Sequence, residues 1–142
     1  MKKHTGYWVT VALFSAVYTF SAIMDLTGVG PAKETLAHLG YPAYVGTILG
    51  LWKAGAVVAL LAPRLGRLKE WAYAGIVFDL TGGFISHLAA GDPLPKPIIP
   101  VVLLALALTS YVLRPASRKL ADDEHADAQR RHRDRDLAGH HA

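Results

Sequence analysis

Four long stretches of the chain are nearly free of charged residues, and polar segments separate them. They cover about residues 7–26, 43–62, 71–88 and 98–113. Residues 7–24 hold 14 apolar residues of 18, and residues 98–113 hold 13 of 16, with no charge in either stretch. A helix needs roughly 17–25 mainly apolar residues to cross a bilayer. The pattern therefore predicts an all-α protein, an integral membrane four-helix bundle.

The basic residues are divided unequally between the two sides that four spans imply. Residues 2–3, the segment 63–70 and the segment 114–142 together hold twelve Lys and Arg, whereas the other side holds only Lys33 and Lys96. Loops rich in Lys and Arg stay on the cytoplasmic side of a membrane. We therefore predict a multi-pass membrane protein with both its N- and C-termini cytoplasmic.

The two segments on the outer side differ in kind. Residues 27–42 are long enough to lie as a lid on the bundle, and within them Pro31 can begin a short helix that Gly40 would end. Residues 89–97 contain three prolines, which is typical of a stiff turn.

Composition as an average hides this organisation. The chain is 52% hydrophobic, as a soluble domain is, but 13 of its 26 charges lie in residues 114–142. We predict a transmembrane domain over residues 1–113 and a charged cytoplasmic tail over 114–142 that is disordered or a surface helix. The net charge of +4 reflects orientation, and the nearly balanced tail argues against nucleic acid as a partner.

Two other interpretations account for part of the pattern. A soluble four-helix bundle also has apolar helices, but its helices carry a polar stripe that the first and fourth segments lack. A cleaved signal peptide over residues 1–22 would explain Lys2 and Lys3 before an apolar run, but the run continues through Met24 and offers a poor cleavage site.

Two charged residues fall near the middle of predicted spans. Lys53 lies ten residues before Pro63, and Asp79 lies nine residues after Glu70, so both sit roughly 14 Å from the cytoplasmic side. Since an unpaired ion in hydrocarbon is costly, we expect these two side chains to pair. Such a pair is either a structural contact that sets helix register or part of a ligand site.

The third span concentrates its polar residues on one face. Asp79, Gly82, Gly83, Ser86 and His87 follow helical spacing, and we expect this face to point into the bundle. Asp25 and His87 end their spans on the same outer side, and we predict that they form a polar cluster there, as interfacial caps or as proton-relaying groups. Gly46 and Gly50 predict close helix packing inside the bundle.

The absence of certain residues restricts the chemistry. The chain has no Cys, which excludes disulfides and thiolate sites, and only His87 lies within a span, too few for a haem held by two histidines. We find no nucleotide-binding loop, no metal-ligand spacing and no assignable catalytic residue. A bound quinone or a partner subunit would have to supply any redox chemistry.

Several short motifs resemble the DoxX-like family of small bacterial membrane proteins. They are Leu39-Gly40-Tyr41-Pro42, Gly50-Leu51-Trp52-Lys53, the stretch from Leu68 to Gly75 followed by the stretch from Phe78 to Gly82, Ser86-His87 and Gly91-Asp92-Pro93. The resemblance covers about residues 7–114 and implies a four-helix membrane fold in the bacterial inner membrane. It also implies association with membrane redox complexes in some relatives and assembly roles in others, and it brings no catalytic residue to this chain.

The sequence leaves enzymatic and non-enzymatic functions open. The preferred hypothesis is an accessory or quinone-interacting component of a membrane redox system, with Lys53, Asp79, His87, Asp25 and Ser86 as the candidate buried polar residues. The alternatives are a non-enzymatic assembly or stability factor that binds other membrane proteins or a second copy of itself, and a small-molecule transporter. Four helices without an internal repeat give little support to the transporter.

Overall fold

Helices are the only regular secondary structure within the residues that the computed structural model describes, which are 2–115, 118–119, 125 and 127–133. The helices of the first 112 residues are α1 (Lys2–Thr27), α2 (Pro31–His38), α3 (Ala43–Leu61), α4 (Gly66–Ala89) and α5 (Ile98–Val112). The all-α class is therefore confirmed, as is a short helix beginning at Pro31.

The long helices differ in how well they suit a membrane. By length and composition, α1 and α3 qualify as membrane spans. The apolar α5 has only 15 residues, about 22 Å of helix. In contrast, α4 begins five residues before the predicted span, so its first turns carry Arg67, Lys69 and Glu70.

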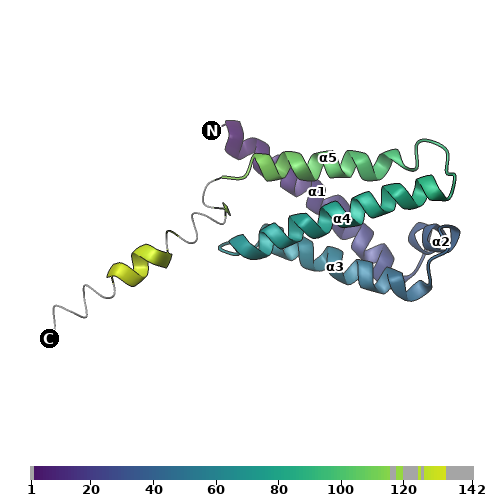
Figure 1. Ribbon diagram of the computed structural model, residues 1–142, viewed down its shortest axis with the longest axis horizontal. Coiled ribbons are helices and arrows are strands. Elements are labelled where there is room, and N and C mark those ends of the chain that lie inside the picture. The colour runs from purple at the N-terminus through teal and green to yellow at the C-terminus, as the bar shows by residue number, and fades with distance from the viewer. Residues whose placement is uncertain (1, 116–117, 120–124, 126, 134–142) are drawn as a thin grey trace.

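The four long helices contact one another in the cyclic order α1, α3, α4, α5. The N-terminus, the α3–α4 turn and the beginning of the tail lie at one end of the molecule, which we call the proximal end (Figure 1). The helix α2 and the α4–α5 loop lie at the other, the distal end. Helix α1 crosses behind the others diagonally, from α5 at the proximal end to α3 at the distal end.

Two glycines of α3 bring it close to α1. A Cβ atom on Gly50 would lie 2.6 Å from Cγ of Leu26 and 3.0 Å from the carbonyl oxygen of Ala22. A Cβ on Gly46 would lie 3.2 Å from the carbonyl oxygen of Asp25. The absence of side chains at both positions therefore permits the α1–α3 contact, and the predicted packing role of Gly46 and Gly50 is confirmed.

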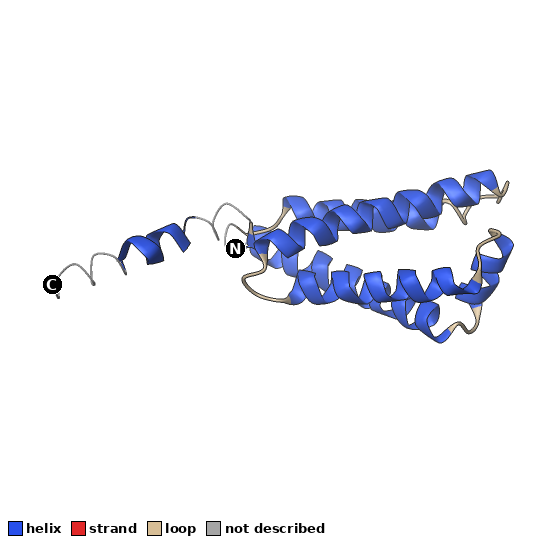
Figure 2. Cartoon of the chain, turned by 60° about the horizontal axis from the view of Figure 1, so that its bottom comes forward, coloured by secondary structure: helices blue, strands red, loops and turns tan. Residues whose placement is uncertain are grey.

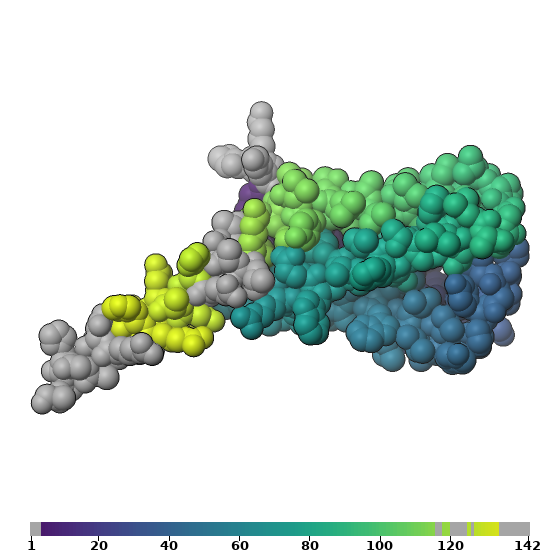
Figure 3. Space-filling model, in the orientation of Figure 1, coloured from purple at the N-terminus to yellow at the C-terminus, as the bar shows by residue number. Residues whose placement is uncertain are grey.

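The hydrophobic core fills only the proximal half of the molecule. Its members are Phe14, Tyr18, Ala59, Leu60, Ala72, Tyr73, Ile76, Leu80 and Ala107. Beyond Leu80, α4 has no buried residue, and α5 has none before Ala107. In the distal half the α4–α5 pair stands apart from α3, as Figure 2 shows, and the space-filling surface is hollowed between α4 and the α2–α3 side (Figure 3).

The outer surface of the helices is apolar. Each long helix exposes large hydrophobic side chains, including Phe20 on α1, Trp52 on α3, Phe78 on α4 and Val112 on α5. Trp52 and Phe78 are 74% and 76% exposed. A soluble bundle would present polar side chains at these positions, so this surface argues against the soluble interpretation.

Basic side chains cap the C-terminus of α3 at the proximal end. Lys69 is buried and donates to the carbonyl oxygen of Ala62, and Nη1 of Arg118 donates to the carbonyl oxygens of Leu60 and Leu61. These carbonyls have no partner within the helix, and the C-terminal end of a helix dipole favours cations. The basic inner loop is shorter than the predicted segment 63–70, because the second half of that segment belongs to α4.

The beginning of the predicted tail is attached to the bundle. Arg114 is buried, its Nη1 lies 2.7 Å from Oε1 of Glu70, and its guanidinium lies 3.9 Å from the centre of the Tyr111 ring. Residues 127–133 are helical. The prediction of disorder over 116–117, 120–124, 126 and 134–142 lies outside the described residues.

We expect Gly50→Ala to destabilise the protein by about 1–3 kcal/mol, because the added methyl group overpacks the α1–α3 contact. Thermal unfolding in mild detergent, followed by circular dichroism, measures the effect as a lower Tm.

Gly55→Ala is the matched control on the same helix. Gly55 is exposed, and nothing lies within 4 Å of the position that an added methyl group would take. Alanine has the higher helix propensity, so the Tm of this variant should stay equal or rise. An equal loss of stability in both variants would contradict the packing role of Gly50.

Candidate functional site

Five polar side chains from α1, α3 and α4 meet inside the bundle. We call them the central cluster: Tyr18, Ser21 and Asp25 of α1, Lys53 of α3 and Asp79 of α4. The Lys53 ammonium lies 2.7 Å from Oδ2 of Asp25, 3.1 Å from Oγ of Ser21 and 3.8 Å from Oδ2 of Asp79. Tyr18 donates a hydrogen bond of 2.7 Å to the same Asp79 oxygen. The expected approach of Lys53 to Asp79 is present, but Asp25 is the nearer partner.

The charges of the central cluster do not balance. One ammonium faces two carboxylates, so the ionised cluster carries a net charge of −1. The side chains of Lys53 and Asp25 are only 12% and 8% exposed, whereas that of Asp79 is 18% exposed. Asp79 is also farther from the ammonium and relies on a neutral phenol as its closest donor. Asp79 is therefore the carboxylate whose charge the protein compensates least.

The predicted cluster of Asp25 with His87 is wrong. Asp25 is bonded to Lys53, and His87 is bonded to Asp92 in the α4–α5 loop. The close approach at Gly46 and Gly50 directs the last turns of α1 toward α3 instead of α4. The two residues therefore belong to different clusters.

The polar face of α4 only partly follows the prediction. Asp79, Gly83, Ser86 and His87 are half-buried, as expected for a face that points toward the other helices. Gly82 is exposed, and a methyl group there would contact nothing. Because α4 has no buried residue beyond Leu80, this face stays partly accessible and leads toward the central cluster.

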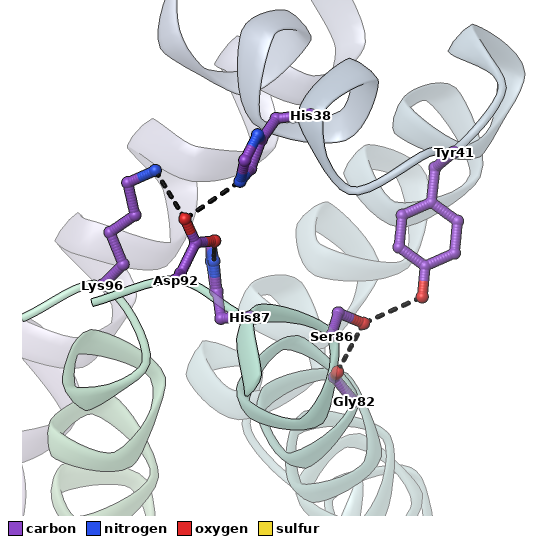
Figure 4. Close-up of polar contacts among 7 residues, drawn as sticks. All are labelled: His38, Tyr41, Gly82, Ser86, His87, Asp92 and Lys96. Atoms are coloured by element: carbon purple, nitrogen blue, oxygen red, sulfur yellow. Dashed lines mark hydrogen bonds and ion pairs between the residues drawn. The ribbon is translucent and has the colours of Figure 1, made fainter. Parts of the chain in front are cut away.

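A second polar cluster lies at the distal end, around Asp92 (Figure 4). Oδ1 of Asp92 accepts from Nζ of Lys96 at 2.8 Å and lies 2.9 Å from Nε2 of His38. Its other oxygen lies 2.7 Å from Nδ1 of His87. An ionised carboxylate only accepts hydrogen bonds, so both facing imidazole nitrogens carry a hydrogen. The Asp92 side chain is 3% exposed.

These donors stabilise the charged form of Asp92. Hydrogen bonds from His87 and then from Lys96 hold the pKa of the Asp92 carboxyl well below its usual range, with a smaller contribution from His38. Desolvation raises the pKa but does not outweigh them. Asp92 is therefore a carboxylate throughout the physiological pH range.

Ser86 connects α4 to the segment that follows α2. Its hydroxyl donates to the carbonyl oxygen of Gly82 at 2.8 Å, and it lies 2.8 Å from the hydroxyl of Tyr41. Since the Ser86 proton is used within α4, Tyr41 is the donor of the second bond. Figure 4 shows this contact beside the Asp92 cluster.

The structure adds residues that the sequence analysis did not select. Tyr18 and Ser21 lie seven and four residues before Asp25, which the sequence analysis did select, and this helical spacing would have placed all three on one face. No comparable signal marks His38 or Asp92, because 54 residues separate them and both lie in or beside loops.

We expect Lys53→Met to cost about 3–5 kcal/mol, because it leaves two carboxylates inside the bundle without a cation. Adding Asp25→Asn should restore more stability than adding Asp79→Asn, since Asp25 is the closer partner. Thermal unfolding of the three variants in mild detergent measures the order. Lys33→Met, on exposed α2, is the control, and equal Tm values for it and Lys53→Met would contradict the buried ion pair.

The lowered pKa of Asp92 has a consequence for acid stability. A carboxyl whose pKa is lower in the folded state stabilises the fold above its unfolded pKa of about 4, and the stabilisation is lost as the pH falls through the folded pKa. Wild type should therefore have a higher Tm than Asp92→Asn near pH 5, and the difference should shrink toward about pH 2.5. A difference that stays constant over this range would show that the carboxylate is not stabilised in this way.

Comparison with known proteins supports a family for the chain. A family model described as the DoxX-like family matches residues 9–110. No curated protein and no solved structure matches the chain. The match includes α2, α3, α4 and most of α1 and α5, and therefore every member of the central cluster. Together with the two apolar helices α1 and α3, it supports a membrane protein of uncertain activity. The chain belongs to the DoxX-like family.

Proposed function

We propose that this chain is a multi-pass protein of the bacterial inner membrane, with α1, α3, α4 and α5 as its spans and the proximal end in the cytoplasm. The apolar outer surface supports contact with lipid on every long helix. The basic segments near the N-terminus, the α3–α4 turn and the start of the tail all belong to the proximal end, whereas Lys33 and Lys96 belong to the distal end.

Within this membrane protein, the central cluster acts as the ligand site of an accessory, quinone-interacting component of a redox system. The single observation that carries this proposal is a buried Lys53 ammonium between two carboxylates, at the border between the packed proximal half and the open distal half. A structural pair needs only one carboxylate. The second carboxylate and the accessible approach are the features of a site that exchanges protons or binds a polar group.

The chemistry of the cluster suits a quinone headgroup. Such a group has two carbonyl oxygens that accept hydrogen bonds and an apolar body, and when bound it supplies reversible transfer of two electrons and two protons. Lys53 has one N–H beyond those that it donates to Asp25 and Ser21, and Asp79 provides a base that can hold a proton. A proton on Asp79 frees the Tyr18 hydroxyl, which donates to Asp79 in this structure, to donate to a carbonyl oxygen. The surrounding helices provide apolar surface. Electrons would pass to a partner subunit, because the residues of this chain provide only binding and proton exchange.

The proposal is tested with short-chain ubiquinone and menaquinone analogues added to the purified protein in mild detergent. We expect the wild-type Tm to rise with analogue concentration. Tyr18→Phe should raise the apparent Kd by about tenfold, because it removes one hydrogen-bond donor at a charged group.

Tyr73→Phe is the matched control, since it also removes a buried tyrosine hydroxyl, one that is bonded to Ser110 in the proximal core. Its apparent Kd should equal that of wild type. The absence of a shift with any analogue, or an equal loss in both variants, would refute the quinone site. If the variant Lys53→Met with Asp25→Asn also kept the wild-type set of copurifying membrane proteins, that result would instead support the assembly factor.

A further inference from the structure

Helix α2 lies at the distal end, between the ends of α3 and α4 (Figure 1). It is eight residues long and contains no buried residue. On the α3 side it is anchored by Leu36, whose Cδ1 would be 2.9 Å from a methyl group on Gly46. Helix α2 thus lies across the distal end of the bundle while contributing little apolar burial of its own.

Two polar contacts attach this segment to the opposite side. His38, the last residue of α2, is bonded to Asp92 beyond the end of α4, and Tyr41 is bonded to Ser86 within α4. Both contacts appear in Figure 4. We call these two contacts the latch. Residues from α1 and α3 hold α2 on one side, and the latch holds it on the other.

The backbone on either side of α2 is adapted to a sharp change of direction. Gly30 immediately precedes the helix with φ of 64°, and Gly40 follows it with φ of 79°. Both values lie in the left-handed region, which glycine enters without steric cost. A segment that buries little surface and lies between two such glycines has a lower free energy of local opening than the core.

We infer that α2 is a lid that closes the distal approach to the central cluster, and that the latch holds it shut. Release of His38 from Asp92 and of Tyr41 from Ser86 lets α2 move away from α4 while it stays attached to α3. This movement admits a ligand from the distal side. The lid rests on the proposed function only in taking the central cluster as the ligand site. Its movement is measurable without any ligand.

The natural absence of cysteine makes the test direct. Ser21→Cys places a single thiol beside Lys53 in the central cluster, with a change of one atom. The full-length protein in nanodiscs is treated with a polar maleimide, and the rate of thiol labelling is followed by mass spectrometry. Because both faces of a nanodisc are accessible, the measurement does not depend on the orientation of the chain in a membrane.

Breaking the latch in the Ser21→Cys background should speed labelling. We expect about tenfold faster labelling with His38→Ala and Tyr41→Phe together, and a smaller increase with Tyr41→Phe alone, which leaves the Asp92 cluster intact. Lys33→Ala is the matched control, since it removes an exposed charge of α2 that is not part of the latch. Its labelling rate should equal that of the parent.

Equal labelling rates in the latch variants and the parent would overturn the lid. So would an equal acceleration by Lys33→Ala, because that result would mean general loosening of α2. The Tm of each variant is measured in parallel, and the single Tyr41→Phe variant decides the matter if the double variant unfolds. Faster labelling of the latch variants without any quinone effect on the Tm would support the lid and refute the quinone site. Unchanged labelling together with a rise of the Tm with quinone analogues would overturn the lid and support the quinone site.

Discussion

The arrangement of the other helices depends on the pairing of the Lys53 ammonium, which lies inside the helical bundle. A buried cation is tolerated only when carboxylates and hydrogen-bond acceptors surround it. Here the acceptors come from two other helices, with Asp25 and Ser21 on α1 and Asp79 on α4. The ion cluster therefore joins three of the four long helices at one level. Tyr18 extends it by linking α1 to Asp79 directly.

The position of α1 follows from this cluster and from two glycines. Asp25 reaches Lys53 because Gly46 and Gly50 allow the last turns of α1 to lie against α3. The same tilt draws α1 away from the distal parts of α4 and α5. Apolar side chains consequently fill the proximal half, whereas the distal half holds no buried residue of α4 beyond Leu80 or of α5 before Ala107.

The two ends of the molecule are closed by different interactions. At the proximal end, Lys69, Arg114 and Arg118 are packed against helix ends and aromatic rings, which joins the start of the tail to the bundle. At the distal end, polar contacts around Asp92 and Ser86 close the surface. Polar contacts at an accessible surface exchange readily with water, whereas a packed core does not. The distal end is therefore the end suited to admit a ligand.

The sequence by itself determined the helical class, the approximate bounds of the long helices, the short helix at Pro31 and the close packing at Gly46 and Gly50. These features follow from local rules, since apolar length, proline and glycine act through neighbouring residues. Lys53 was also identified as a residue that needs a partner, because the cost of an isolated buried charge depends on the residue itself.

Only the tertiary structure decided which partner Lys53 takes. Spacing along the chain favoured Asp79 on the next helix, whereas the crossing of α1 brings Asp25 closer. Helical periodicity specifies the face that a residue occupies, but helix tilt and loop conformation specify what that face meets. Those depend on contacts between segments far apart in the chain, such as His38 and Asp92 across 54 residues, which no local pattern encodes.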